Sequence, residues 1–80
     1  MKAKVLSLDG AEVISVGVAR KDTSRAGLIF TYEPDEFKAT FLSKLRGAPL
    51  FLFEFEGQTY KISVIDASLG KPIKFGMAPL

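Results

Sequence analysis

The chain has 80 residues, 48% of them apolar, and eleven basic against nine acidic side chains give a net charge of +2. It contains no cysteine and no histidine, which excludes disulfides, thiolate nucleophiles and the side chain most used to bind metals and transfer protons. An enzyme built from this sequence would depend on carboxylates, Lys, Tyr or Ser alone. We therefore expect a protein without catalytic activity, without a bound metal and without a cofactor.

One domain, residues 1–80, is all that this length accommodates. A chain so short buries only about 60–65% of the surface that its unfolded form exposes. Since its apolar content is high, we expect another protein or a second copy to cover some apolar surface. No apolar run approaches the roughly 20 residues that span a bilayer, and no secretory signal follows Lys2 and Lys4. The sequence thus predicts a cytoplasmic protein with no membrane partner.

A β-hairpin is the first predicted element, since Asp9-Gly10 is a favoured pair for a two-residue turn. Pairing outward from this turn gathers a uniformly apolar face that we expect in the core: Met1, Ala3, Val5, Ile14, Val16 and Val18. The opposite face is apolar near the turn and basic beyond it, which makes it the candidate partner surface: Leu6, Leu8, Val13, Lys2 and Lys4. Cover of its apolar part by a loop or by the C-terminal tail is the alternative interpretation.

A loop, a strand and a helix are predicted next. Residues 21–27 are rich in turn formers and favour a loop, whereas residues 28–33 alternate as a strand. For a helix over 34–46, Pro34 suits the first position and Gly47 suits a left-handed C-cap. Its large apolar residues are spaced as one stripe: Phe37, Phe41, Leu42 and Leu45. The acidic residues near its start suit the positive end of the helix dipole: Glu33, Asp35 and Glu36.

A second hairpin is predicted around Gly57-Gln58, which suits a type II′ turn. One face then carries the aromatic and aliphatic residues expected in the core: Phe51, Phe53, Phe55, Tyr60, Ile62 and Val64. On the other face Glu54 lies opposite Lys61, and this ion pair supports the same pairing. Residues 73–75 add a short edge strand. The predicted fold is α+β: a small antiparallel sheet of two hairpins plus a central strand, packed against one amphipathic helix in the order β-β-β-α-β-β.

Motifs that carry chemistry are mostly absent from the sequence. Neither of the glycine-rich phosphate-binding patterns occurs. The acidic residues at 33–36 have the oxygen donors for a metal or for acid–base catalysis, but the start of the helix explains all of them and is the favoured interpretation. No serine or threonine has an evident neighbouring base, so nucleophilic catalysis has no support.

Nucleic-acid binding is the first alternative function. A candidate basic patch lies near the open end of the first hairpin and consists of Arg20, Lys21 and Arg25. Single-stranded nucleic acid binds where such cations alternate with exposed aromatic rings. The aromatic residues instead concentrate in the helix and the second hairpin, together with acidic residues, so we expect them in the core.

The sequence favours a non-catalytic protein-binding domain that acts stoichiometrically, as an assembly subunit, an adaptor or an inhibitor of another protein. Small proteins of this kind are frequent among the accessory proteins of phages and mobile elements. The C-terminal segment 76–80 has little polarity, so we expect Met77 and Leu80 to dock on the same chain or on a neighbour. A homo-oligomer is a companion expectation, and a small-molecule-binding oligomer is the second alternative.

Overall fold

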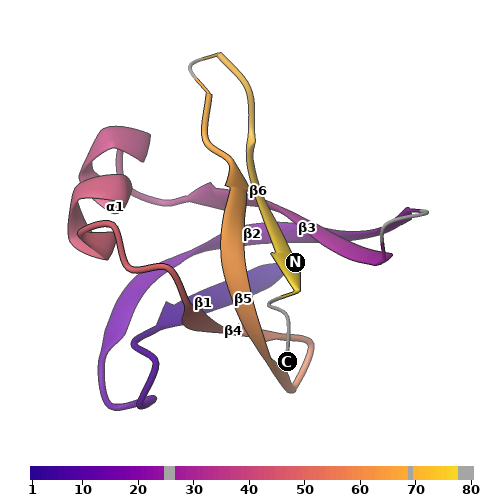
Figure 1. Ribbon diagram of the computed structural model, residues 1–80, viewed down its shortest axis with the longest axis horizontal. Helices are drawn as coiled ribbons and strands as arrows, with labels where there is room; N and C mark the ends of the chain where they lie inside the picture. The colour runs from indigo at the N-terminus through magenta and orange to yellow at the C-terminus, as the bar shows by residue number, and fades with distance from the viewer. Residues whose placement is uncertain (25–26, 69, 78–80) are drawn as a thin grey trace.

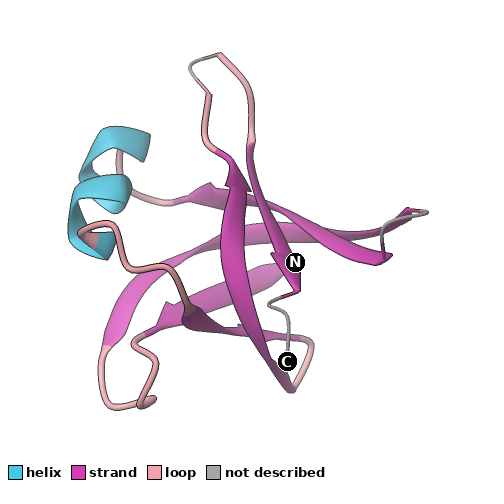
Figure 2. Cartoon of the chain, in the orientation of Figure 1, coloured by secondary structure: helices cyan, strands magenta, loops and turns pink. Residues whose placement is uncertain are grey.

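Six antiparallel strands close into a barrel, and one short helix lies beside two of them (Figure 1, Figure 2). The structure is a computed structural model that describes residues 1–24, 27–68 and 70–77. In chain order the elements are β1 Lys2–Leu6, β2 Val13–Ser24, β3 Gly27–Pro34, α1 Lys38–Leu45, β4 Phe51–Phe55, β5 Gln58–Asp66 and β6 Ile73–Met77.

The strands follow the order β1-β2-β3-β6-β5-β4 around the barrel, and β4 pairs back to β1. Two three-stranded meanders, β1 to β3 and β4 to β6, are linked by α1 and joined along both sides. The predicted α+β fold, an open sheet covered by an amphipathic helix, is therefore wrong. Residues 73–75 are not an edge strand either, because β6 pairs with both β3 and β5. The predicted tail 76–80 begins inside β6, and residues 78–80 lie outside the described part of the chain.

Aromatic rings fill the barrel, which leaves no open sheet face for the helix to cover. Phe30, Phe53 and Phe75 are fully buried, and the ring centroid of Phe53 lies 4.8 Å from that of Phe30 and 5.3 Å from that of Phe75. The helix buries only Phe41 and Leu45. Burial of one such side chain stabilises a fold by about 1.5–3 kcal/mol. The helix therefore adds two side chains to a core that the strands enclose.

The pairing of β1 with β2 begins as predicted and then shifts by one residue. Leu6 pairs with Val13, but Val5 pairs with Ser15, so Ile14 is an extra residue on β2 and forms a β-bulge. Because side chains alternate across a strand, the shift exchanges the two faces of β2 beyond the bulge. There the buried residues are Ser15, Gly17 and Ala19, whereas Val16 and Val18, predicted in the core, are exposed.

Asp9 organises a loop between β1 and β2 that is longer than the predicted two-residue turn. Ser7 Oγ donates to Asp9 Oδ1 at 2.6 Å, and the Ala11 N–H donates to the same oxygen at 2.9 Å. These two hydrogen bonds, that from Ser7 foremost, lower the pKa of the Asp9 carboxyl. The Ser7 N–H donates to the Glu12 carbonyl at 2.9 Å, which closes the loop around residues 8–11.

The ribbon of β2 and β3 occupies most of the predicted loop at 21–27. β2 continues to Ser24 and pairs with β3 as far as Gly27, and residues 25 and 26 lie outside the described part of the chain. In Figure 1 the two strands run on together beyond the rest of the barrel, toward the right of the view. Cross-strand pairing has thus overridden a local composition that is typical of loops.

The helix is shorter than predicted and begins four residues later. Pro34 ends β3, and the Asp35 N–H donates to the Val16 carbonyl at 2.9 Å, which prolongs the strand pairing. The N-cap is Phe37, which is 85% exposed and so does not belong to the buried stripe. At the other end Gly47 has the left-handed φ predicted for it, 69°, and Arg46 before it is left-handed as well, with φ 52°.

The second hairpin keeps its predicted faces but turns one residue earlier. Glu56 and Gly57 form the turn with φ 51° and 79°, as a type I′ turn requires. Each pair is shifted by two residues, so that Glu54 lies opposite Thr59 and the predicted ion pair with Lys61 is not formed. A shift of two preserves the inward set, and Phe51, Phe53, Phe55 and Ile62 are buried as predicted.

Gly17 allows β2 to approach β3 more closely than any side chain permits. A Cβ atom at this position would lie 2.2 Å from the Glu33 carbonyl oxygen and 2.8 Å from Pro34 Cα. We expect Gly17→Ala to lower the free energy of unfolding by roughly 1–3 kcal/mol, as overpacking does, in urea titrations. Gly57→Asn is the control: its site is open and asparagine tolerates a positive φ. Equal stability of the Gly17→Ala protein and the parent would contradict the close approach.

Candidate binding surface

The outer side of β2 carries three of the eight large apolar side chains that are exposed among the described residues. Val16 and Val18 are 42% and 50% exposed, and Val13 at the start of β2 is 58% exposed. Val13 and Val16 lie on the same side of β2, although they are three residues apart, because Ile14 is the extra residue of the bulge between them. Val18 lies on that side too, since alternate residues of a strand share a face. We name this surface the β1–β2 face and define it by Leu6, Val13, Val16, Val18, Lys2 and Lys4.

Charged side chains of both signs surround the valines of the β1–β2 face. Lys2 lies opposite Val18, and Lys4 lies between Val16 and Glu54. Among the described residues neither lysine forms an ion pair. A hollow of about 560 Å³ follows the face, and its acidic lining consists of Asp35, Glu54 and Glu56. The face therefore has an apolar centre and a rim of unpaired charges.

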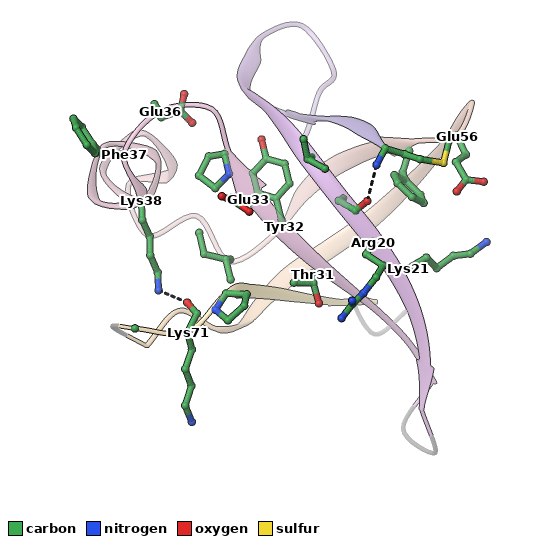
Figure 3. Close-up of a pocket in the computed structure, with 18 residues that line it drawn as sticks. Arg20, Lys21, Thr31, Tyr32, Glu33, Glu36, Phe37, Lys38, Glu56 and Lys71 are labelled. Carbon is green, nitrogen blue, oxygen red and sulfur yellow. Dashed lines mark hydrogen bonds between the residues drawn. The ribbon is translucent and has the colours of Figure 1, made fainter.

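A second hollow, the α1 groove, adjoins the β1–β2 face and has a volume of about 1010 Å³ (Figure 3). It extends from Phe37 at the start of α1 to Arg20 on β2. Met1, Val18 and Glu56 line both hollows. The β1–β2 face and the α1 groove are consequently one continuous surface.

Lys38 fixes one wall of the α1 groove. Its ammonium group donates to the carbonyl oxygen of Ser68 and, at 2.8 Å, to that of Lys71 (Figure 3). Asp66 Oδ1 accepts hydrogen bonds from the Ser68 N–H at 2.9 Å and from its hydroxyl at 2.8 Å, and these lower the pKa of the Asp66 carboxyl. The segment between β5 and β6 is thereby tied to the first residue of α1.

Phe37 lies at the rim of the α1 groove, and its side chain neither packs in the core nor caps the helix. It is the N-cap of α1, has extended backbone angles and makes no side-chain capping hydrogen bond. Serine, aspartate and asparagine stabilise this position because their oxygens accept hydrogen bonds from free helical N–H groups. An exposed phenylalanine here forgoes that stabilisation, and Figure 3 shows its ring directed away from the barrel.

A chain of polar groups lies at the buried side of the segment that precedes α1. Ser15 Oγ lies 2.7 Å from the Tyr32 hydroxyl and donates to Glu36 Oε1 at 2.5 Å, so the Tyr32 hydroxyl donates to Ser15. Lys44 Nζ lies 3.2 Å from Glu36 Oε2. Ser15 is only 3% exposed, which keeps a substrate from its hydroxyl. These hydrogen bonds and the ion pair therefore attach α1 to β2 and β3. Of the acidic residues predicted to begin the helix, Glu36 takes part in this attachment.

The residues singled out from the sequence are partly brought together. Four of the five residues of the predicted partner surface share the β1–β2 face, and Leu8 lies 51% exposed in the adjoining loop. Arg20 and Lys21 are successive residues of β2, so their side chains leave opposite faces. Arg20 Nε lies 3.4 Å from Asp22 Oδ2. Arg25 and Leu80 lie outside the described residues, and Met77 is a half-exposed residue of β6.

The sequence reasoning missed three residues of this surface: Val16, Val18 and Phe37. The alternation of Lys2 and Lys4 with buried Ala3 and Val5 was the available signal for the outward side of β1. In β2 both alternating sets are apolar or small before the arginine, so no comparable signal exists there.

The first prediction of this surface concerns the N-cap. Phe37→Asp should raise the free energy of unfolding by about 1 kcal/mol, because the carboxylate accepts a hydrogen bond from the free N–H groups of the first helical turn. Thermal and urea unfolding measure the change. Phe37→Ala, which removes the ring without adding a cap, is the control and should stay within about 0.5 kcal/mol of the parent. Loss of stability in the aspartate variant would mean that the ring supports the fold.

A pH dependence follows from Tyr32. Burial foremost, together with the carboxylates of Glu36 and Asp35, raises the pKa of Tyr32 to about 12. The neutral tyrosine thus contributes stability below its ordinary pKa of 10, and this is lost as pH rises toward 12. Two pKa units correspond to at most about 2.7 kcal/mol.

Tyr32→Phe should remove this alkaline loss, which unfolding titrations between pH 9 and about 12 measure. Tyr60→Phe, which changes a half-buried tyrosine on β5, is the control. It keeps Tyr32 and should still lose stability at alkaline pH. The same alkaline slope in the Tyr32→Phe protein and the parent would show that another group is responsible.

The described residues contain neither a metal-binding cluster nor a membrane-spanning helix. Within them no cluster of three or more acidic side chains is arranged to hold a metal ion, and no helix has the length and apolarity to cross a membrane. Comparison with known proteins gives no match to a family model, to a curated protein or to a solved structure. The function is therefore inferred from the surface that the barrel presents.

Proposed function

We propose that this chain is a non-catalytic protein-binding domain that acts stoichiometrically through the β1–β2 face. The observation that carries the proposal is the exposure of Val16 and Val18, at 42% and 50%, on a strand whose opposite side is buried. Outward valines add nothing to the core, and a contiguous apolar patch with a polar rim is typical of a contact surface.

The charges around the patch favour a protein partner over nucleic acid. A nucleic-acid site requires cations gathered on one face, whereas Lys2 and Lys4 are interspersed with Glu54 and Asp35. A protein interface uses such a mixed rim to select its partner and its orientation. A second copy of the chain is the companion proposal, since the face carries both signs of charge and an isologous contact must complement itself.

The proposal predicts that charges placed in the apolar centre abolish binding. The double variant Val16→Lys with Val18→Lys should reduce partner binding at least tenfold, because it inserts two ammonium groups into the contact, while the outward positions leave the barrel folded. The tagged protein is used to capture its partner from the producing organism at physiological salt, with nuclease added, and sedimentation of the purified protein reports self-association.

Ile65→Lys provides a matched control, since Ile65 is 52% exposed on β5, away from the β1–β2 face. A protein retained in a fixed ratio by the parent and by the control, but not by the double variant, is the expected result. Equal retention by all three forms, or loss of the retained material on nuclease treatment, contradicts the proposal.

A further inference from the structure

β2 is longer than the strand beside it and leaves part of its edge open. Its pairing with β1 reaches Lys2 opposite Val18, and Met1 adds two backbone hydrogen bonds to Ala19. Beyond Ala19, β2 continues to Ser24 and is paired with β3 alone among the described strands. This continuation of β2 is therefore unpaired on its β1 side among the described strands.

The direction of the backbone groups on this edge follows from two hydrogen bonds. The Ala19 N–H donates to the Met1 carbonyl at 2.8 Å, so Ala19 directs its backbone groups toward β1. The Val16 carbonyl accepts from the Asp35 N–H and faces the opposite neighbour. In an antiparallel strand these directions alternate residue by residue. Lys21 and Thr23 share the direction of Ala19, so each presents an N–H and a C=O on the side where β1 has ended.

We propose that an extended segment of the partner protein adds to this edge as an antiparallel strand, with hydrogen bonds to the backbone of Lys21 and Thr23. The added strand continues the line of β1 and lies beside the β1–β2 face, so the inference rests on the proposed function. Strand addition at an open sheet edge is an established mode of peptide recognition, in which the main chain supplies affinity and alternate side chains supply specificity.

The charges along the edge specify the chemistry of the added segment. Arg20 is engaged with Asp22 at 3.4 Å, whereas Lys21 is exposed and forms no ion pair among the described residues. A residue directly opposite Lys21 in the added strand would lie within reach of its ammonium group, and opposite charges so placed are favourable. We therefore infer an extended peptide with an acidic residue opposite Lys21.

The same charges disfavour a second copy as the occupant in the two symmetric registers that use the backbone of Lys21. Two copies could pair symmetrically along this edge as antiparallel strands. If the backbone of Lys21 in each copy pairs with that of Thr23 in the other, the two Asp22 residues lie directly opposite each other. Centring the pair one residue earlier instead sets two Lys21 residues in opposition. Like charges directly opposite are destabilising, and charged residues on an exposed edge are a common protection against self-pairing.

Thr23→Pro tests the inference because it removes an outward N–H that the β2–β3 pairing does not use. Proline is tolerated on the open side of an edge strand, so the barrel should keep its melting temperature to within a few degrees. Thr23→Val keeps the N–H and serves as the matched control. The probe is a linear peptide selected against the parent protein from a displayed library of alternating Thr, Val and Glu residues, and calorimetry measures its Kd.

The expected result is a Kd at least tenfold weaker for Thr23→Pro and within about twofold of the parent for Thr23→Val. Peptide binding should also slow hydrogen exchange at the amides of Lys21 and Thr23. Lys21→Glu should weaken binding of a glutamate-containing peptide and favour its lysine counterpart. If Thr23→Pro fails to fold, methylation of the peptide's own backbone nitrogens, applied to the unmodified protein, tests the same hydrogen bonds.

Several outcomes overturn the inference. These are unchanged affinity for Thr23→Pro or for the methylated peptide, protection confined to other amides, and failure to select any binding peptide. Self-association that Thr23→Pro abolishes would assign the edge to a second copy instead. The valine-to-lysine double variant could abolish partner capture while Thr23→Pro leaves it intact. That result would overturn the added strand, and the proposed function would stand. Capture that survives both sets of changes would overturn the two together.

Discussion

The packing of large aromatic rings inside a small closed barrel is the constraint on which the rest of the structure depends. Six of the seven phenylalanines are buried, and they come from β3, β4, β6 and α1. Because a protein interior is close-packed, strands that contribute no ring have little inward volume left. Beyond its bulge, β2 accordingly buries only small residues: Ser15, Gly17 and Ala19. Its larger valines lie outside because the ring-filled core has no room for them.

That constraint also determines how the helix is attached. A ring-filled barrel needs no amphipathic helix as a lid, and α1 buries Phe41 and Leu45, with Leu42 packed partly against the core. Its orientation is instead set by polar contacts, in which Ser15 links Tyr32 to Glu36. A buried serine is acceptable at this position because both of its hydrogen-bonding roles are satisfied. The start of α1 is thus positioned by the barrel, which leaves Phe37 free to face solvent.

Local elements were largely predictable from the sequence, whereas closure was not. The hairpin of β4 and β5 keeps its inward set despite a shifted turn, because a displacement of two residues preserves the faces. One extra residue at Ile14 had the opposite effect on β2, where both alternating sets are apolar or small and no charge indicates the outward side. The pairings of β1 with β4 and of β3 with β6 join distant segments, and no turn or spacing signals them. An open sheet with a covering helix was the simplest arrangement of the same elements.

The candidate site was predictable only where charge indicated the outward side. Lys2 and Lys4 identified the exposed side of β1, and the structure adds Val16 and Val18 to it from β2. The open edge had no sequence signal, since it depends on which strands pair with β2 beyond Ala19, and there β3 alone pairs with it among the described strands. The edge arises because β2 pairs with the whole of β3, and this pairing carries β2 beyond its last contact with β1. An exposed apolar face and an unpaired backbone edge then meet on β2, at the point where Met1 ends the pairing with Ala19. A partner that engages one of them lies within reach of the other, so we propose that the two act as parts of a single interaction surface.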